Sequence, residues 1–347
     1  MGLSLARTVT GLASVASKAA VAVPAAALFV LTNACAAPPT TTTATTATTA
    51  TTATAATASG TTPSIQDICG ECKVERYARC GADKFVEGPT FDAAGNLWAV
   101  SLFSGEVLKI PAGADRCEVV AHTGGAPNGA RLTPDGKLLI ADRDRNLLSF
   151  DPSSKAFTVV ATKYGRETLR GLNDLVPDKA GGWYFTEPYG SNALRPTGRV
   201  FYLPPGAGQL KLVAENFAFP NGIALSPDEK RLYVSDFATN RIIAVPLGDP
   251  GQVNPLGTPY VFAHLEGGMG PDGLNVDARG NVYAAHYFAG RVRVFTSFGE
   301  PYGSIRLPEG AGRQTTNVTF RDGHLYITEA GKGEVWRVKT AFPGTAP

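Results

Sequence analysis

Six oxygen-bearing side chains recur at one position of a repeated sequence pattern. Each opens a short apolar segment, and none of the six is itself apolar. The residues, which we call the first ring, are Glu87, Asn128, Asn173, Asn221, Asp272 and Asn317. Carboxylate and amide oxygens, without histidine or cysteine, are the ligands that hard divalent cations prefer. The set therefore predicts a cation site, provided that the fold brings these positions together.

Four of these residues form the predicted metal site: Glu87, Asn173, Asn221 and Asp272. The two carboxylates would supply two negative charges to one divalent ion, and the two asparagines would supply neutral oxygens. We expect Ca²⁺, because it accepts a roomy and irregular oxygen cage, whereas Mg²⁺ requires a tight octahedron. Zn²⁺ and Mn²⁺ stay open as alternatives.

The Asn221-Gly222 pair has a second explanation. Asn-Gly is a favoured turn dipeptide, because both residues tolerate a positive φ. Turn formation does not explain Glu87, however, nor Asn317, which a valine follows. It also does not require six polar residues in register. We therefore interpret the six residues together as a functional ring.

A second polar residue follows each member of the first ring, after one turn and one further apolar segment. These residues, the second ring, are Ser101, Asp142, Glu187, Asp236, His286 and Glu329. Two roles are open for them: they cap strand ends, or they form an acidic layer that supports the first ring or faces a substrate. Three aromatic residues follow second-ring residues: Phe103, Tyr189 and Phe288. They either line the site or pack within the blades.

The elements that must position these residues come from an internal repeat. Each repeat contains an apolar strand, a turn usually rich in Asp and Gly, a second apolar strand, a third strand and often a fourth. The first two strands of each repeat cover residues 87–101, 128–142, 173–187, 221–236, 272–286 and 317–329. A period of about 40–50 residues with four strands per unit is typical of a β-propeller.

Six repeats predict an all-β, six-bladed β-propeller over residues 83–340, with four antiparallel strands per blade. The first strand of a blade lies innermost, so the first ring should lie at one end of the central axis. The last repeat lacks a fourth strand, and residues 73–85 should supply it and close the ring. Residues 64–82 form a cysteine-containing lead-in segment.

The N-terminal part of the sequence predicts export. Arg7 and Lys18 precede an apolar run that ends in small residues around Cys35, as in a signal peptide over residues 1–35. Lipidation of Cys35 and ordinary cleavage at a small-residue site both stay open. Residues 36–63 are almost entirely Thr and Ala, which predicts a disordered tether. We expect a periplasmic or cell-surface protein that contacts a membrane only through such a lipid anchor.

Four further cysteines, an even number in an exported chain, predict two disulfides with three connectivities left open: Cys69, Cys72, Cys80 and Cys117. A zinc site is the weaker alternative, because Cys69 and Cys72 lack a second closely spaced pair. The net charge of +2 and the lack of a Lys/Arg run argue against a nucleic-acid partner. We expect a monomer that acts on a small molecule.

The ordered motifs resemble the gluconolactonase, senescence-marker-protein and luciferin-regenerating-enzyme superfamily. The matching segments are EGP at 87, GLNDLVPDKAGGWYFTEPYG at 171–190, FPNGIALSPDEKRLYVSD at 219–236, GPDGLNVDARGNVYAAHYFAGRVRVF at 270–295 and TTNVTFRDGHLYITEA at 315–330. The resemblance covers most of residues 83–340. It implies a six-bladed fold that hydrolyses lactones or, in some relatives, organophosphates, with one catalytic divalent ion that is usually calcium.

Position by position, the resemblance implies the same four metal ligands as the first ring. It also implies that Arg170 touches the substrate, although Arg170 lies one residue farther from Asn173 than in the sugar-lactonase pattern. We place Asn173, Glu187 and Asn128 at the substrate as well. Ala330 and Thr319 stand where organophosphate-hydrolysing relatives carry histidines, so the sequence favours a lactonase with a single ion.

The resulting hypothesis is an exported, metal-dependent lactonase in which a water attacks the lactone carbonyl. Asp272 is the expected general base, and His286, on the same blade, is the alternative base. Two other functions stay open: a calcium-stabilised propeller that binds a partner without catalysis, and an arylesterase or phosphotriesterase that uses the same site.

Overall fold

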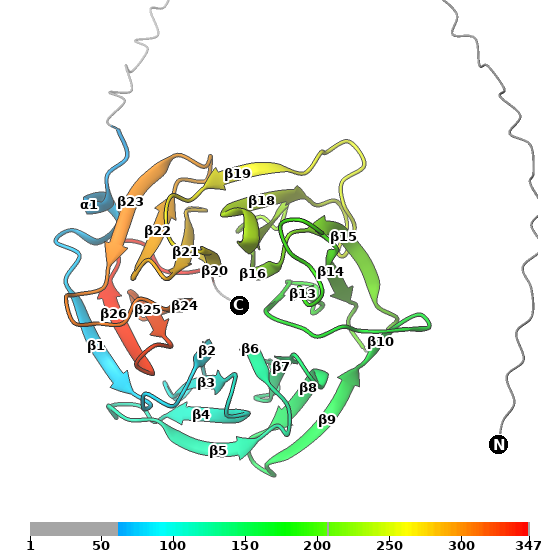
Figure 1. Cartoon of the computed structure of the whole chain (residues 1–347), viewed down its shortest axis with the longest axis horizontal. Coiled ribbons are helices and arrows are strands. Elements are labelled where there is room, and N and C mark those ends of the chain that lie inside the picture. The colour runs from blue at the N-terminus through cyan, green and yellow to red at the C-terminus, as the bar shows by residue number, and fades with distance from the viewer. Residues whose placement is uncertain (1–61, 207, 346–347) are drawn as a thin grey trace, which may run out of the picture. The chain divides into compact units, whose positions relative to one another are not determined.

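The computed structural model describes residues 62–206 and 208–345. It shows six four-stranded antiparallel sheets placed around a central axis (Figure 1), which confirms the predicted six-bladed β-propeller. The predicted signal peptide, including Cys35, and nearly all of the predicted tether lie outside the described residues. Within the described part of the chain, no helix is long and apolar enough to span a membrane.

Each blade contains four strands, which in blades 1 to 5 follow sequence order from the axis outward. Blade 1 consists of β2 (Val86–Phe91), β3 (Leu97–Ser101), β4 (Glu106–Ile110) and β5 (Glu118–His122). Blade 2 consists of β6 (Pro127–Leu132), β7 (Leu138–Asp142), β8 (Asn146–Asp151) and β9 (Ala156–Ala161). Blade 3 consists of β12 (Leu175–Pro177), β13 (Trp183–Glu187), β14 (Gly198–Leu203) and β15 (Lys211–Phe217).

The second half of the propeller repeats this plan. Blade 4 consists of β16 (Pro220–Leu225), β17 (Arg231–Asp236), β18 (Arg241–Pro246) and β19 (Tyr260–His264). Blade 5 consists of β20 (Gly270–Val276), β21 (Val282–Tyr287), β22 (Arg291–Phe295) and β23 (Pro301–Arg306). Blade 6 consists of β24 (Thr315–Arg321), β25 (His324–Glu329), β26 (Glu334–Lys339) and β1 (Val74–Arg79).

The remaining described elements are short. They are α1 (Ile65–Cys69), the hairpin of β10 (Lys163–Tyr164) and β11 (Glu167–Thr168), and the 3₁₀ turn η1 (Phe237–Thr239). Helix α1 begins with a capping box, in which the side chains of Ser64 and Asp67 satisfy backbone N–H groups of the first turn. It packs against β23 on the outside of blade 5.

Blade 6 is closed by a strand from the other end of the chain, as the sequence predicts. β1 pairs with β26 in antiparallel fashion, so the outermost strand of the last blade precedes the first blade in the sequence (Figure 1). The structure brings the four cysteines together as two disulfide pairs, Cys69–Cys72 and Cys80–Cys117. The second pair joins the segment after β1 to the segment before β5, and so fastens blade 6 to blade 1.

The hydrophobic core is divided among the interfaces between neighbouring blades. Six clusters of buried side chains each combine residues of two adjacent blades. Because every sheet is covered on both faces, its central strands are buried along their whole length, as β3, β7 and β13 are. This explains the continuous apolar runs in the sequence, since a half-exposed strand would alternate instead.

Candidate functional site

The first ring lies where the innermost strands are irregular. In five blades, the pairing between first and second strands skips one residue at or beside the ring position, and such β-bulges re-aim side chains. The sixth case, Asn173, directly precedes Asp174 and the start of β12. The inner strands of neighbouring blades pack side by side around the axis. The bulges therefore lie together at one end of that axis.

The glycine after a first-ring residue is required by close packing between blades. A Cβ on Gly222 would lie 2.2 Å from the carbonyl oxygen of Asp272, and one on Gly273 would lie 2.1 Å from Cγ of Asn317. Asn221 and Gly222 lie inside β16, and neither has a positive φ. The turn explanation of the Asn-Gly pair is therefore wrong: glycine is needed because two backbones converge.

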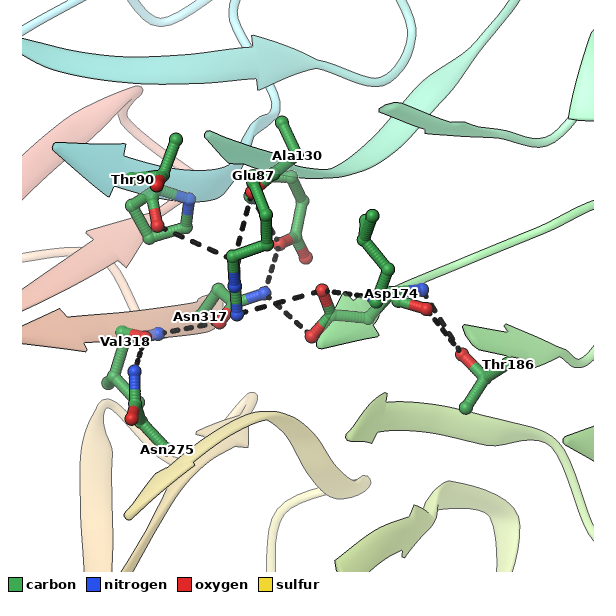
Figure 2. Close-up of polar contacts among 12 residues, drawn as sticks. Glu87, Thr90, Ala130, Asp174, Thr186, Asn275, Asn317 and Val318 are labelled. Carbon is green, nitrogen blue, oxygen red and sulfur yellow. Dashed lines mark hydrogen bonds and ion pairs between the residues drawn. The ribbon is translucent and has the colours of Figure 1, made fainter. Parts of the chain in front are cut away.

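Three carboxylates gather at this end of the axis. Glu87, Asp174 and Asp272 are 3%, 1% and 5% exposed. The side-chain amide of Asn317 joins two of them, since its Nδ2 donates to Oε2 of Glu87 and to Oδ2 of Asp174, both at 3.3 Å (Figure 2). Asn221 is hydrogen-bonded to Asp272 through its side chain, and Asp272 lies close enough to repel both other carboxylates. We call Glu87, Asp174, Asp272, Asn221 and Asn317 the carboxylate cluster.

The carboxylates of the cluster resist ionisation. Burial, followed by repulsion from Asp174, raises the pKa of Glu87 to about 8. Burial and the charges of Glu87 and Asp174 raise the pKa of Asp272 well above its ordinary value. Burial also raises the pKa of Asp174, which the guanidinium of Arg131 opposes. Three buried carboxylates that repel one another cannot all be ionised unless positive charge enters the cluster.

Arg131 supplies part of that positive charge. Its Nη2 lies 3.8 Å from Oδ1 of Asp174, and its Nη1 donates to the carbonyl oxygen of Ala130. One guanidinium against three carboxylates leaves two negative charges uncompensated, which matches one divalent ion. Carboxylate and amide oxygens suit calcium. Among the described residues, no three His, Cys, Asp or Glu side chains are close enough to hold a metal without other ligands, so the amides would have to contribute.

The structure joins three of the four predicted metal ligands, Glu87, Asn221 and Asp272, in one cluster. Asn173 is buried beside it, but the contacts that connect blade 3 to the cluster run through its neighbour Asp174. Sequence reasoning missed Asp174. A signal was present: glycine follows the ring position in four blades, whereas blade 3 has Asp174 there.

The second ring supports the first. Its carboxylates accept backbone N–H groups from the segment that leads into the inner strand of the same blade. These donors are Ala126 for Asp142, Arg170 for Glu187, Ala218 for Asp236 and Gln314 for Glu329. All six second-ring residues are at most 2% exposed. Of the two roles left open by the sequence, the structure favours strand-end capping that positions the first ring.

Arg170 is the exposed partner of a buried ion pair. Its Nε and Nη2 donate to Oε2 of Glu187 at 3.0 and 2.9 Å, and Nη2 also donates to the carbonyl oxygen of Thr197 at 2.7 Å. Arg199 donates to the same carboxylate oxygen at 2.6 Å. Glu187 is fully buried, whereas the Arg170 side chain is 31% exposed. Glu187 can therefore act on a substrate only by holding Arg170.

His286 and Tyr287 occupy different environments, although they are adjacent on β21. His286 is fully buried; its Nε2 packs against Gly268, and its Nδ1 faces Arg291. Burial lowers the pKa of His286 to about 4. The imidazole has no access to a bound molecule, which argues against the alternative base. Tyr287 instead lies within electrostatic reach of the cluster: burial, then the charges of Asp272 and Glu87, raise its pKa to about 12.

A second tyrosine approaches the cluster from blade 3. The side chain of Asn128 is hydrogen-bonded to Tyr189, and the charge of Glu87 reaches the same hydroxyl. Burial is the main cause that raises the pKa of Tyr189 to about 12. Asn128, predicted as a substrate contact, therefore positions Tyr189. Both tyrosines stay protonated at neutral pH and can donate a hydrogen bond to an oxygen near the carboxylates.

Comparison with known proteins matches this chain to one family and to two lactonases. The family described as "SMP-30/Gluconolactonase/LRE-like region" matches residues 85–331. Lactonase drp35 of Staphylococcus haemolyticus is 31% identical over 250 residues, which cover 69% of this chain and 75% of the relative. Lactonase drp35 of Staphylococcus aureus strain USA300 is 32% identical over 255 residues, with the same coverage.

Two solved structures have a similar fold. A gluconolactonase from Xanthomonas campestris superposes with a TM-score of 0.69 at 25% identity, covering 80% of this chain and 92% of that one. Regucalcin from Agrobacterium tumefaciens, described as a calcium-binding protein, has a TM-score of 0.64 at 23% identity, covering 78% and 96%. The latter likeness shows the fold alone.

Proposed function

The chain belongs to the SMP-30/gluconolactonase/LRE-like family, and from this premise we propose that it is a divalent-cation-dependent lactonase. One observation carries the proposal: Glu87, Asp174 and Asp272 are buried together at one end of the propeller axis. A propeller that bound a partner without any cation would have no reason to keep three mutually repelling carboxylates. The curated relatives named above are lactonases.

Glu87, Asn173, Asn221 and Asp272 are the proposed ligands, and Asp174 completes the negative charge of the site. The residues fit calcium because they offer only oxygen atoms and an excess of negative charge. When bound, the cation would polarise the lactone carbonyl and stabilise negative charge on its oxygen. Zn²⁺ or Mn²⁺ could serve in its place, and metal analysis of the purified protein would identify the ion.

The reaction we propose is attack of water on the lactone carbonyl carbon, followed by opening of the ring ester. Asp272 is the proposed base that accepts the proton of the attacking water, because both other carboxylates of the cluster repel its charged form. Tyr189 and Tyr287 are neutral donors beside the cluster and could hydrogen-bond the substrate oxygens. Arg170, held by Glu187, would orient the substrate.

The test combines chelation with a substrate panel. Sugar lactones, alkyl lactones, aryl esters and phosphotriesters are assayed before and after chelation, and again after calcium is added. We expect lactone hydrolysis that stops on chelation and returns with calcium. Full activity after chelation would overturn the metal mechanism, and preference for esters or phosphotriesters would reassign the reaction. Calcium-dependent stabilisation without any hydrolysis would identify a binding propeller.

We also propose that the protein is exported and acts as a monomer, without a nucleic-acid partner. The signal-like sequence of residues 1–35 and the pairing of all four described cysteines support export, since disulfides persist in oxidising compartments. Cell fractionation of the full chain tests this location. Palmitate labelling of the full chain and of Cys35→Ala tests the lipid anchor, and recovery in the cytosol would contradict export.

A further inference from the structure

Six aromatic rings form a continuous chain of contacts beside the carboxylate cluster. We call them the aromatic arc: Tyr189, Phe219, Phe237, Tyr287, Phe85 and Phe103. The successive ring centroids are 5.8, 5.8, 6.0, 6.3 and 4.9 Å apart. The rings come from blades 1, 3, 4 and 5, from the segments at the ends of first and second strands. The arc therefore follows more than half of the circumference of the axis.

The arc connects the carboxylate cluster with the surface. Tyr189 and Tyr287 lie within electrostatic reach of Glu87. At the other end, Phe103 is 70% exposed, and Phe288, whose ring centroid is 4.9 Å from that of Tyr287, is 42% exposed. Large exposed apolar side chains that continue into a polar site indicate a ligand-binding surface.

Backbone strain marks the same surface. Phe219 has a φ of 67° and Phe288 a φ of 60°. They are the two aromatic residues among the described non-glycine residues with positive φ. Bulky residues rarely adopt this left-handed conformation, and where they do, the strain is commonly retained at ligand-binding sites. Packing within a blade would not by itself require a strained backbone at either position.

The charged groups near the arc are already engaged in bonds. The carboxylates of Asp142, Glu187, Asp236 and Glu329 are buried and accept backbone or arginine donors. They are therefore unable to bind the several hydroxyl groups of a sugar lactone. The polar groups that remain near the cluster are Arg170, the two tyrosine hydroxyls and Arg143, whose guanidinium pairs with Asp144 and lies 6.0 Å from the centre of the Tyr189 ring. They are enough to recognise one ester group.

We propose that the aromatic arc binds the non-reacting part of the substrate, so that the enzyme prefers lactones with an apolar substituent to hydroxylated sugar lactones. This inference rests on the proposed lactonase function and names its substrate class. The ester group would lie at the carboxylate cluster, and the apolar substituent would lie along the rings toward Phe103 and Phe288.

The first test uses the calcium-loaded protein and γ-lactones whose alkyl substituent grows from methyl to octyl, with gluconolactone as the polar reference. Burial of each methylene should raise kcat/KM by about two- to fourfold until the arc is filled. Phe219→Asn, which keeps a residue that tolerates a positive φ, and Phe237→Leu should flatten this dependence. Phe298→Ala is the matched control, since Phe298 is 86% exposed in the turn between β22 and β23, away from the arc.

The second test measures binding without turnover, using alkyl-substituted γ-lactams as non-hydrolysable analogues in calorimetry. Affinity should rise with chain length in the wild type and in Phe298→Ala. In Phe219→Asn, affinity should be lower than in the wild type and should depend less on chain length. If lactams bind in this way but no lactone is hydrolysed, the arc is confirmed and the lactonase proposal fails. If lactones are hydrolysed with no dependence on chain length, or if gluconolactone is preferred, the arc assignment is overturned and the lactonase proposal stands.

Discussion

The two rings of polar residues look alike in the sequence and differ in the structure. Both recur once per blade, both are buried, and both contain carboxylates, two in the first ring and four in the second. Second-ring carboxylates such as Glu329 accept several N–H donors, whereas Glu87 and Asp272 face other carboxylates. A buried charge with enough donors stabilises its surroundings, and one without them needs a cation. The number of N–H donors around a buried carboxylate, rather than its residue type, therefore distinguishes structural carboxylates from those proposed to bind a cation.

Removal of the proposed base should have the largest effect. Asp272→Asn should reduce kcat/KM roughly 10³-fold, because a positioned base is lost. The metal-free variant should unfold at the same temperature as the wild type or higher, since one of three repelling carboxylates is gone. Enzyme assays and thermal unfolding check both parts. Asp135→Asn, at an exposed turn of blade 2, is the matched control and should match the wild type in both measurements.

In the second ring, by contrast, we expect a substitution to reduce stability. Glu329 accepts backbone N–H groups of Gln314, Gly331 and Lys332. Glu329→Gln replaces one acceptor oxygen with a donor, and should lower the free energy of unfolding by about 2–4 kcal/mol. Chemical denaturation measures this loss. A variant as stable as the wild type would show that the second ring is not a structural support.

The pH dependence of stability should separate the metal-free protein from the calcium-loaded one. Glu87 has a pKa raised to about 8 in the folded state, above the unfolded value of 4.5. Between these values the folded state holds a proton that the unfolded state has released, so metal-free stability should fall as the pH rises from about 4.5 to 8. Thermal unfolding from pH 5 to pH 9 tests this.

Calcium should remove the decline in stability, because a cation replaces the proton as the compensating charge. The calcium-loaded protein should therefore melt at a nearly constant temperature through the same pH range. A metal-free protein that instead gains stability between pH 5 and pH 8 would contradict the environment assigned to Glu87.

A smaller effect should follow from removal of the compensating charge at Arg131. Arg131→Met leaves Asp174 without its cationic neighbour, so the cluster becomes more negative. Calcium affinity should then increase by about tenfold, while the metal-free protein becomes less stable. Calorimetric titration provides the measurement, and Arg131→Lys, which keeps the charge, is the control. Equal affinities in Met and Lys variants would show that Arg131 does not tune the site.

The sequence predicts the propeller well, because the propeller depends on a pattern that is repeated in register. The closing strand was predictable for the same reason, since the last repeat is one strand short. Glu87, Asn221 and Asp272 could be chosen because their residue types contrast with the apolar segments they open. The repeat constrains which strand each residue belongs to, and the topology of a propeller then places these strands at the axis.

The details that the sequence did not predict depend on local geometry and distant partners. His286 and Tyr287 are neighbours, and successive residues of a strand point to opposite faces. An error of one residue in the predicted site position therefore selects the buried imidazole instead of the tyrosine near the cluster. The role of Glu187 depends on Arg199, which lies on another strand. The bulges beside five first-ring positions, and the close approach of neighbouring blades at Gly222 and Gly273, each involve more than one strand, so no single strand sequence reveals them.

The most direct test of the central claim is a calorimetric calcium titration of metal-depleted protein, comparing the wild type with Glu87→Gln and Asp135→Asn. We predict one ion per chain in the wild type and in Asp135→Asn, with binding weakened roughly 100-fold or more in Glu87→Gln. Unchanged affinity in Glu87→Gln, or no calcium binding by the wild type, would contradict the assignment of a cation to the carboxylate cluster.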